Sequence, residues 1–181
     1  YDHIYRECTV ASANWLMRTS DLKTCGGFEN LTYPEDYDLL FRWYKAGFHI
    51  KGIQEVTHLW RDHDLRTSKT SDDYQQKAFF KLKIKRFIEL EFKNDGPLII
   101  NGTGQKGRIT AKYLLEWKIP FFWISHEATK FPNGIFNHPI LGIDEIPIAE
   151  KAQVLNTTLL SEKSLVEIYS KHIATLYFYQ L

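Results

Sequence analysis

A short apolar segment followed by a glycine-rich turn and a helical segment constrains the second half of this sequence most strongly. Residues 98–100 (Leu-Ile-Ile) predict a buried strand, residues 102–107 a turn, and residues 109–117 a helix. Residues 120–124 predict a second strand. Because strands that alternate with helices form parallel sheets, we expect residues 96–181 to fold as a small α/β domain with a Rossmann-like parallel sheet.

The end of this domain is predicted from two further apolar segments and one helix start. Residues 140–143 form a third apolar patch, and residues 153–156 predict another strand. A closing helix is expected over residues 161–179, because Ser161 is of a residue type that commonly caps a helix N-terminus.

The glycine-rich turn matches the Gly-x-Gly-x-x-Gly pattern of nucleotide-binding folds through Gly102, Gly104 and Gly107. In such turns the backbone approaches a diphosphate at a helix N-terminus, and a later acidic residue binds a ribose. Glu127 lies 20 residues after Gly107, where that acid would be expected. The same turn also serves tight strand–helix packing without a ligand, and the domain is too short for both halves of a dinucleotide fold. Both interpretations stay open, and the length favours the structural or interaction role.

Residues 73–93 predict one long helix, because apolar side chains recur there at helical spacing. The shared apolar face carries Phe80, Ile84, Phe87 and Ile88. Such a broad apolar face packs on two sides, so residues 73–95 are interpreted as a bridging helix between two domains. Its basic residues are expected to form a solvated face, or to contact anionic lipid or phosphate; they are Lys81, Lys83, Lys85 and Arg86.

The first part of the chain predicts short strands around two helices. Residues 9–17 and 49–53 have the small and apolar composition of strands. A short helix is expected to stop at residues 26–27 (Gly-Gly). Residues 34–36 (Pro-Glu-Asp) predict the start of the next helix, because Pro fits a first turn and acidic groups there face the positive end of the helix dipole.

Composition argues against several classes of function. The net charge is only +1, so no overall field favours binding to nucleic acid. No apolar run approaches the ~20 residues of a membrane helix, and no signal peptide is visible. Cys8 and Cys25 do not form a Cys-x-x-Cys motif, and we expect them to be free thiols in a reducing cytosol.

Glu35 and Asp36 are the candidate catalytic pair. Transfer of a sugar from a nucleotide donor needs a general base for the acceptor hydroxyl and a cation that holds the leaving diphosphate. A carboxylate at a helix N-terminus that faces a cleft is suited to act as the base. The alternative is an ordinary acidic first turn that stabilises its helix.

Four segments around this pair occur in a recognisable order. They are residues 14–18 (Asn-Trp-Leu-Met-Arg), 25–29 (Cys-Gly-Gly-Phe-Glu), 35–39 (Glu-Asp-Tyr-Asp-Leu) and 60–63 (Trp-Arg-Asp-His). Together they resemble the C-terminal half of the GT-A catalytic domain in family 2 inverting glycosyltransferases, over residues 10–71. The resemblance implies that residues 1–72 are the acceptor-side part of such a domain, and that residues 96–181 are a small Rossmann-like accessory domain.

The resemblance also implies roles for single residues. Asp36 would be the catalytic base, and Glu35 would help to bind the acceptor. His63 would lie near the diphosphate or its metal. The residues implied to contact the acceptor, the sugar or phosphate are Gly27, Phe28 and Arg61.

One departure from the family concerns the donor site. The family has nucleotide-binding strands and a metal-binding Asp-x-Asp motif well before the Glu-Asp helix, whereas 34 residues precede Glu35 here. The resemblance implies that the donor half lies outside these residues and that the isolated chain does not turn over a nucleotide sugar.

In the intact enzyme the resemblance implies a divalent metal (Mg²⁺ or Mn²⁺), a nucleotide-sugar donor, and a glycan or lipid-linked acceptor. The product would be a surface polysaccharide made in the cytoplasm, with peripheral contact to the inner face of the membrane as one arrangement. The alternative function is a nucleotide-binding or regulatory module that uses residues 102–107 and performs no transferase chemistry.

Overall fold

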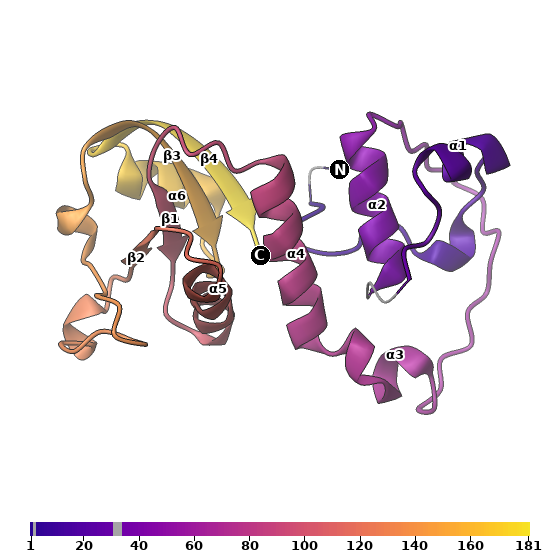
Figure 1. Cartoon of the computed structure of the whole chain (residues 1–181), viewed down its shortest axis with the longest axis horizontal. Coiled ribbons are helices and arrows are strands. Elements are labelled where there is room, and N and C mark those ends of the chain that lie inside the picture. Colours follow the sequence, from indigo (N-terminus) through magenta and orange to yellow (C-terminus); the bar gives the residue numbers. More distant parts are fainter. Residues whose placement is uncertain (2, 31–33) are drawn as a thin grey trace. The chain divides into compact units, whose positions relative to one another are not determined.

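The computed structural model describes residues 1, 3–30 and 34–181 and divides the chain into two compact units (Figure 1). The N-terminal unit is Tyr1–Arg86 and the C-terminal unit is Phe87–Leu181. The boundary lies within helix α4 (Gln76–Leu90), inside the segment for which one long helix was predicted. Among the described residues, no helix combines the length and the apolar composition needed to cross a bilayer.

The N-terminal unit consists mainly of helices joined by irregular segments. Helix α2 begins directly after Pro34, as predicted, and Gly47 with a φ of 72° follows its last turn. That conformation lets the N–H of Phe48 donate to the carbonyl of Trp43 over 3.0 Å, which closes the helix end. The elements are a 3-10 turn (Ser12–Asn14), α1 (Thr19–Thr24), α2 (Glu35–Lys45), α3 (Thr67–Thr70), a second 3-10 turn (Asp72–Tyr74) and the first part of α4.

The core of the N-terminal unit is built on the buried face of α2. Tyr37 stacks on Phe41 with ring centroids 5.0 Å apart, and the Tyr37 hydroxyl donates to the carbonyl of Ile4. Phe80 and Ile84 of α4 are buried in the same unit. The apolar side chains of α2 that are withdrawn from water are Tyr37, Leu39, Leu40, Phe41 and Trp43.

Two predicted strands in this unit are wrong. Residues 9–17 contain a 3-10 turn instead, and Leu16 is 100% exposed. Residues 49–53 are irregular and largely exposed. The physical reason is that a strand needs neighbouring backbone to complete its hydrogen bonds, and the sheet found in the described residues contains only strands from the C-terminal unit.

The basic residues of α4 do not form a single solvated face. Lys81 and Lys85 are exposed, but Lys83 is buried and its ammonium donates to the carbonyl of Arg6 over 2.6 Å. The side chain of Arg86 is 11% exposed. Two of the four cations therefore serve contacts inside the N-terminal unit.

The C-terminal unit contains a four-stranded parallel sheet in the order β2-β1-β3-β4, which Figure 1 shows together with α5 and α6. Ile100 of β1 is in register with Trp123 of β2 and with Leu155 of β3. The prediction of an α/β unit with a parallel, Rossmann-like sheet is confirmed. The elements are β1 (Leu98–Asn101), α5 (Gln105–Glu116), β2 (Phe122–Ile124), β3 (Ala149–Asn156), α6 (Glu162–Tyr169) and β4 (Ile173–Gln180), with 3-10 turns at Ala128–Lys130 and Ile143–Glu145.

Alternate residues of the strands divide the core of this unit into two layers. One layer joins Ile99 and Val154 of the sheet to Leu165 and Tyr169 of α6. Ile100 and Leu155 are buried on the opposite face of the sheet. Both faces of the central strands are thus covered, which is the usual condition for a parallel sheet and explains their continuous apolar sequence.

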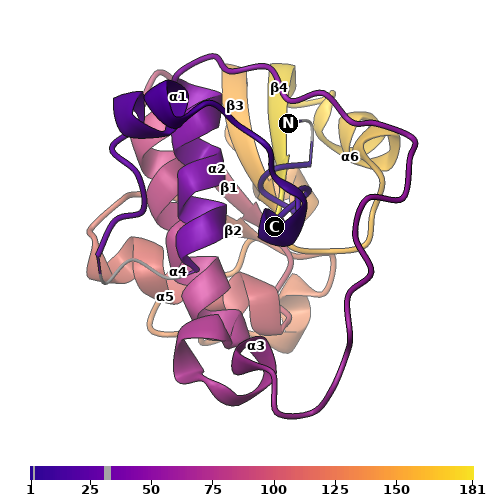
Figure 2. The same ribbon diagram turned by 90° about the vertical axis from the view of Figure 1, so that its right-hand side faces the viewer.

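The predicted closing helix over residues 161–179 is wrong in its second half. Ser161 caps α6 as predicted, because its hydroxyl oxygen accepts the N–H of Ser164 at 3.2 Å. The helix ends at Tyr169, and β4 follows beside β3 (Figure 2). Residues 173–180 (Ile-Ala-Thr-Leu-Tyr-Phe-Tyr-Gln) are rich in aromatic and β-branched types, and an available strand edge on β3 decides the conformation.

Candidate functional site

The predicted catalytic pair lies in the first turn of α2, where the two carboxylates have different partners. Both side chains are half-buried. The hydroxyl of Tyr74 donates to Glu35 Oε2. Asp36 Oδ1 accepts the N–H of Tyr37 at 2.7 Å, and no hydrogen-bond partner is found for Asp36 Oδ2 among the described residues. Each carboxylate therefore keeps one oxygen without a hydrogen-bond partner among the described residues. Asp36 is bonded to the backbone of its own helix, whereas Glu35 is bonded to a side chain 39 residues away.

Cys8 lies close enough to Asp36 to sense its charge. Burial raises the pKa of the Cys8 thiol to about 11, and the negative charge of Asp36 contributes to the increase. The thiol hydrogen bonds to the carbonyl of Val10 at 3.4 Å. Cys8 is consequently a protonated, poorly nucleophilic thiol at neutral pH. Its pKa responds to the charge of Asp36.

The turn after α1 places Gly27 and Phe28 at the surface of the N-terminal unit. Gly26 and Gly27 have φ values of 79° and 65°, a left-handed conformation that glycine adopts without strain. The N–H of Gly27 donates to the carbonyl of Leu22 at 2.9 Å. Phe28 is 53% exposed, so its ring is free to contact a ligand. The guanidinium of Arg42 donates to the carbonyl of Cys25 and so connects this turn to α2.

A buried charge cluster on α2 is the feature that the sequence reasoning missed. Asp38 is fully buried, and its Oδ2 accepts the Nε–H of Arg42 at 3.0 Å. The spacing of four residues between Asp38 and Arg42 is the one sequence signal for this pair. The second cation, Arg86, comes from α4. It lies 48 residues after Asp38, so no local sequence pattern indicates this pair.

Arg61 and His63 are exposed in the irregular segment between α2 and α3. Within the described residues the structure records no contact between either side chain and Glu35 or Asp36. Asp62, between them, instead accepts hydrogen bonds from Arg66 and Lys69, which lower its pKa. No group of three or more His, Cys, Asp or Glu side chains in the described residues is arranged to hold a metal ion.

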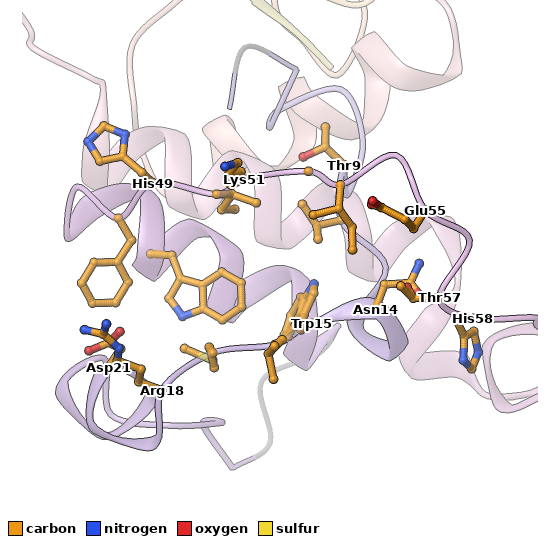
Figure 3. A pocket seen from close by; sticks show the side chains of 18 of the residues that line it. Thr9, Asn14, Trp15, Arg18, Asp21, His49, Lys51, Glu55, Thr57 and His58 are labelled. Carbon is orange, nitrogen blue, oxygen red and sulfur yellow. The ribbon is translucent and has the colours of Figure 1, made fainter.

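A cavity of about 700 Å³ lies in the N-terminal unit, away from the predicted catalytic pair (Figure 3). Figure 3 shows the segment with Lys51 across the cavity from the segment with Trp15 and Arg18. Trp43 is 5% exposed and packs on Trp15 with ring centroids 4.5 Å apart. Neither indole N–H has a partner among the described residues. None of Glu35, Asp36, Arg61 and His63 lines this cavity.

In the C-terminal unit the three glycines of the turn have three different environments. A Cβ on Gly102, which has a φ of 107°, would lie 2.6 Å from the Thr158 side chain. A Cβ on Gly107 would lie 2.1 Å from the carbonyl oxygen of Gly102. Gly104 precedes α5 with a φ of −67°, and a Cβ there would meet no heavy atom within 4 Å. Packing thus explains Gly102 and Gly107 but not Gly104.

The carboxyl ends of β1 and β3, where the strand order reverses, are filled by a buried polar network. The amide of Asn101 donates to Asn156 Oδ1 at 3.0 Å, and the Tyr169 hydroxyl donates to Asn101 Oδ1 at 2.9 Å. Burial raises the pKa of Tyr169 well above its ordinary value, which keeps the hydroxyl as a donor. Asn156 also donates to Gln180 Oε1 at 2.6 Å. Ligands of open α/β sheets commonly bind at such a point, but here its own side chains occupy it.

The charged residues near the glycine-rich turn have protein partners. The ammonium of Lys106 donates to the carbonyl of Leu181 at 2.8 Å. Glu127 pairs with Lys130, and that hydrogen bond lowers the pKa of the Glu127 carboxyl. The indole N–H of Trp123 donates to the carbonyl of Gly102 at 2.8 Å and so connects β2 to the turn. The candidate ribose-binding acid is thus half-buried and ion-paired in this structure.

Comparisons with models of protein families, with curated proteins and with solved structures find no match to this chain. The fold defines the C-terminal unit as an α/β unit of Rossmann-like type.

Proposed function

We propose that the N-terminal unit is the acceptor-side part of an inverting glycosyltransferase, with Asp36 as the general base. The observation that carries the proposal is the first turn of α2, where Asp36 Oδ2 has no partner among the described residues and the Tyr74 hydroxyl orients the neighbouring Glu35 through Oε2. The Gly27-Phe28 turn, connected to the same helix through Arg42, supplies an exposed aromatic wall for an acceptor sugar.

The proposed step is a single displacement. Asp36 takes the proton of the acceptor hydroxyl, the hydroxyl oxygen forms a bond to the anomeric carbon of the donor sugar, and the bond from that carbon to the nucleoside diphosphate breaks. A base in this position contributes about 10²- to 10⁴-fold to the rate. In this proposal a donor-binding half, which would also hold any Mg²⁺ or Mn²⁺, completes the site.

The test compares Asp36→Asn with Asp72→Asn in a protein that also contains the donor-binding half. Asp72 is an exposed carboxylate in a 3-10 turn and serves as the matched control. We expect Asp36→Asn to lower kcat at least ~10²-fold while the circular dichroism spectrum is unchanged, and Asp72→Asn to retain activity. Retained activity in Asp36→Asn would exclude it as the base, and transfer by the isolated 181 residues would exclude the two-part arrangement.

A second candidate function is supported by Gly104. Two of the three glycines are required by internal packing, but the space around Gly104 is open, which suits close approach of a diphosphate to the backbone at the start of α5. In this function the C-terminal unit binds a nucleotide without transferase chemistry.

Titration with UDP and with NAD, followed through the amide resonances of residues 102–107, tests this second candidate. Saturable shifts that Gly104→Ala abolishes and Gly52→Ala preserves would support it. Gly52 is the control because a Cβ there also meets no atom within 4 Å. Absence of shifts with both nucleotides would leave the turn a packing feature of the fold.

A further inference from the structure

Arg86 faces the interior of the N-terminal unit, although it lies in a run of basic residues on α4. Its Nε donates to Asp38 Oδ1 at 3.0 Å, and its Nη2 donates to the same oxygen. Its side chain is 11% exposed, and that of Asp38 is fully buried. A guanidinium that shares two donors with one buried carboxylate is a specific contact, unlike a solvated surface cation.

Asp38 also binds a second guanidinium, that of Arg42. Its other oxygen, Oδ2, accepts the Nε–H of Arg42 at 3.0 Å. Glu29 Oε1 lies 3.9 Å from Arg42 Nε, and Glu29 Oε2 lies 3.9 Å from Arg86 Nη2. The cluster thus contains two positive and two negative charges. Because a buried charge is tolerated only when it is paired, removal of one member leaves the others with unfavourable charge.

Arg42 connects this cluster to the glycine turn. Its Nη1 donates to the carbonyl of Cys25, and a Cβ on Gly26 would lie 3.5 Å from the same nitrogen. The next residue, Gly27, is held from its other side by the carbonyl of Leu22. The position of the turn relative to α2 therefore depends on where the Arg42 guanidinium points.

We propose that Arg86 is a positioning residue for the acceptor site. Through Asp38 and Arg42 it fixes the turn that carries Phe28 against α2, and thereby sets the acceptor wall relative to Asp36. The role in an acceptor site rests on the proposed function. The contact chain, from Arg86 through Asp38 and Arg42 to the carbonyl of Cys25, is independent of any activity. It assigns a role in the site to a residue 48 positions after Asp38, in a different helix.

Hydrogen exchange in the 181-residue chain tests the contact chain directly. We expect Arg86→Gln to accelerate exchange of the Gly27 amide by about tenfold or more relative to the Phe41 amide of α2, because Arg42 loses its fixed orientation. Lys81→Gln, which removes an exposed cation from the same helix, is expected to change neither amide. Equal acceleration at Gly27 and Phe41 would show a general loss of stability and would overturn the positioning role.

Two further measurements separate positioning from general stability and from the proposed reaction. Arg86→Lys, which retains the charge, is expected to restore most of the protection at Gly27. In the protein with its donor half, Arg86→Gln is expected to raise KM for the acceptor several-fold while KM for the donor is unchanged. If the unsubstituted protein transfers no sugar, the proposed function fails and the exchange result still decides the contact chain. An unchanged acceptor KM in an active protein would overturn the role of Arg86.

Discussion

Replacement of Gly107 by alanine tests whether the glycine-rich turn is required by packing. The new Cβ would lie 2.1 Å from the carbonyl oxygen of Gly102 and 3.1 Å from Thr157 Oγ1, whereas side-chain carbons keep 3.0 Å or more from other heavy atoms. The first contact is with backbone, which cannot rotate away, so β1 and α5 have to separate. Overpacking of this kind costs up to about 3 kcal/mol. The better helix propensity of alanine offsets this loss of stability by about 1 kcal/mol. We therefore expect a net loss of about 2 kcal/mol.

Amide hydrogen exchange at Ile99 and Ile100 is the appropriate assay, because both are fully buried in β1 and report on the C-terminal unit alone. A loss of about 2 kcal/mol corresponds to exchange that is roughly 30-fold faster. Gly104→Ala is the matched control. Its φ of −67° suits any residue and the site is open, so we expect a change within about 1 kcal/mol of zero. Exchange of Gly107→Ala at the wild-type rate, or an equal loss in both variants, would refute the packing argument.

Two further predictions concern the N-terminal unit. Leu39→Ala is expected to cost about 2–5 kcal/mol in urea unfolding because Leu39 is fully buried, whereas Leu16→Ala, at a fully exposed position, should change stability by less than about 0.5 kcal/mol. For Cys8, the folded-state pKa of about 11 exceeds that of the unfolded thiol, so the unfolded chain loses its proton first and the free energy of unfolding should fall as pH rises from about 9 to 11. Cys8→Ala should make this slope shallower by the share of one thiol, because buried tyrosines such as Tyr37 and Tyr169 also have raised pKa values and keep the rest of it. An unchanged slope in the variant would contradict the assignment. Asp36→Asn should lower the Cys8 pKa modestly, measured by the pH dependence of alkylation.

The elements that sequence alone predicted correctly are those specified by local chemistry. Pro34 and the acidic residues after it mark the start of α2, and Ser161 marks the start of α6. The apolar residues 98–100 and the glycines after them mark β1 and its turn. Each signal acts within a few residues through capping, dihedral preference or burial, so no distant partner is needed to interpret it.

The candidate site was predicted in part. The first-turn carboxylates and the glycine turn were visible as motifs, but the hydrogen bond from Tyr74 to Glu35 joins residues 39 positions apart and left no local signal. The roles expected of Arg61 and His63 stay predictions, since no contact in the described residues brings them to α2. Likewise, the ion pair of Glu127 with Lys130 was not foreseen beside its proposed ribose-binding role.

By itself the sequence determined the alternation of strands and helices from β1 to α6, because hydrophobic runs and turn residues encode it locally. Only tertiary structure decided that residues 173–180 form β4, since an open edge on β3 outweighs helix propensity there. It also decided that residues 9–17 and 49–53 are irregular, because their apolar pattern has no paired strand beside it. The burial of Arg86 against Asp38 likewise depends on contacts between helices. Such pairings join residues that are far apart in the chain, so the local sequence does not predict them.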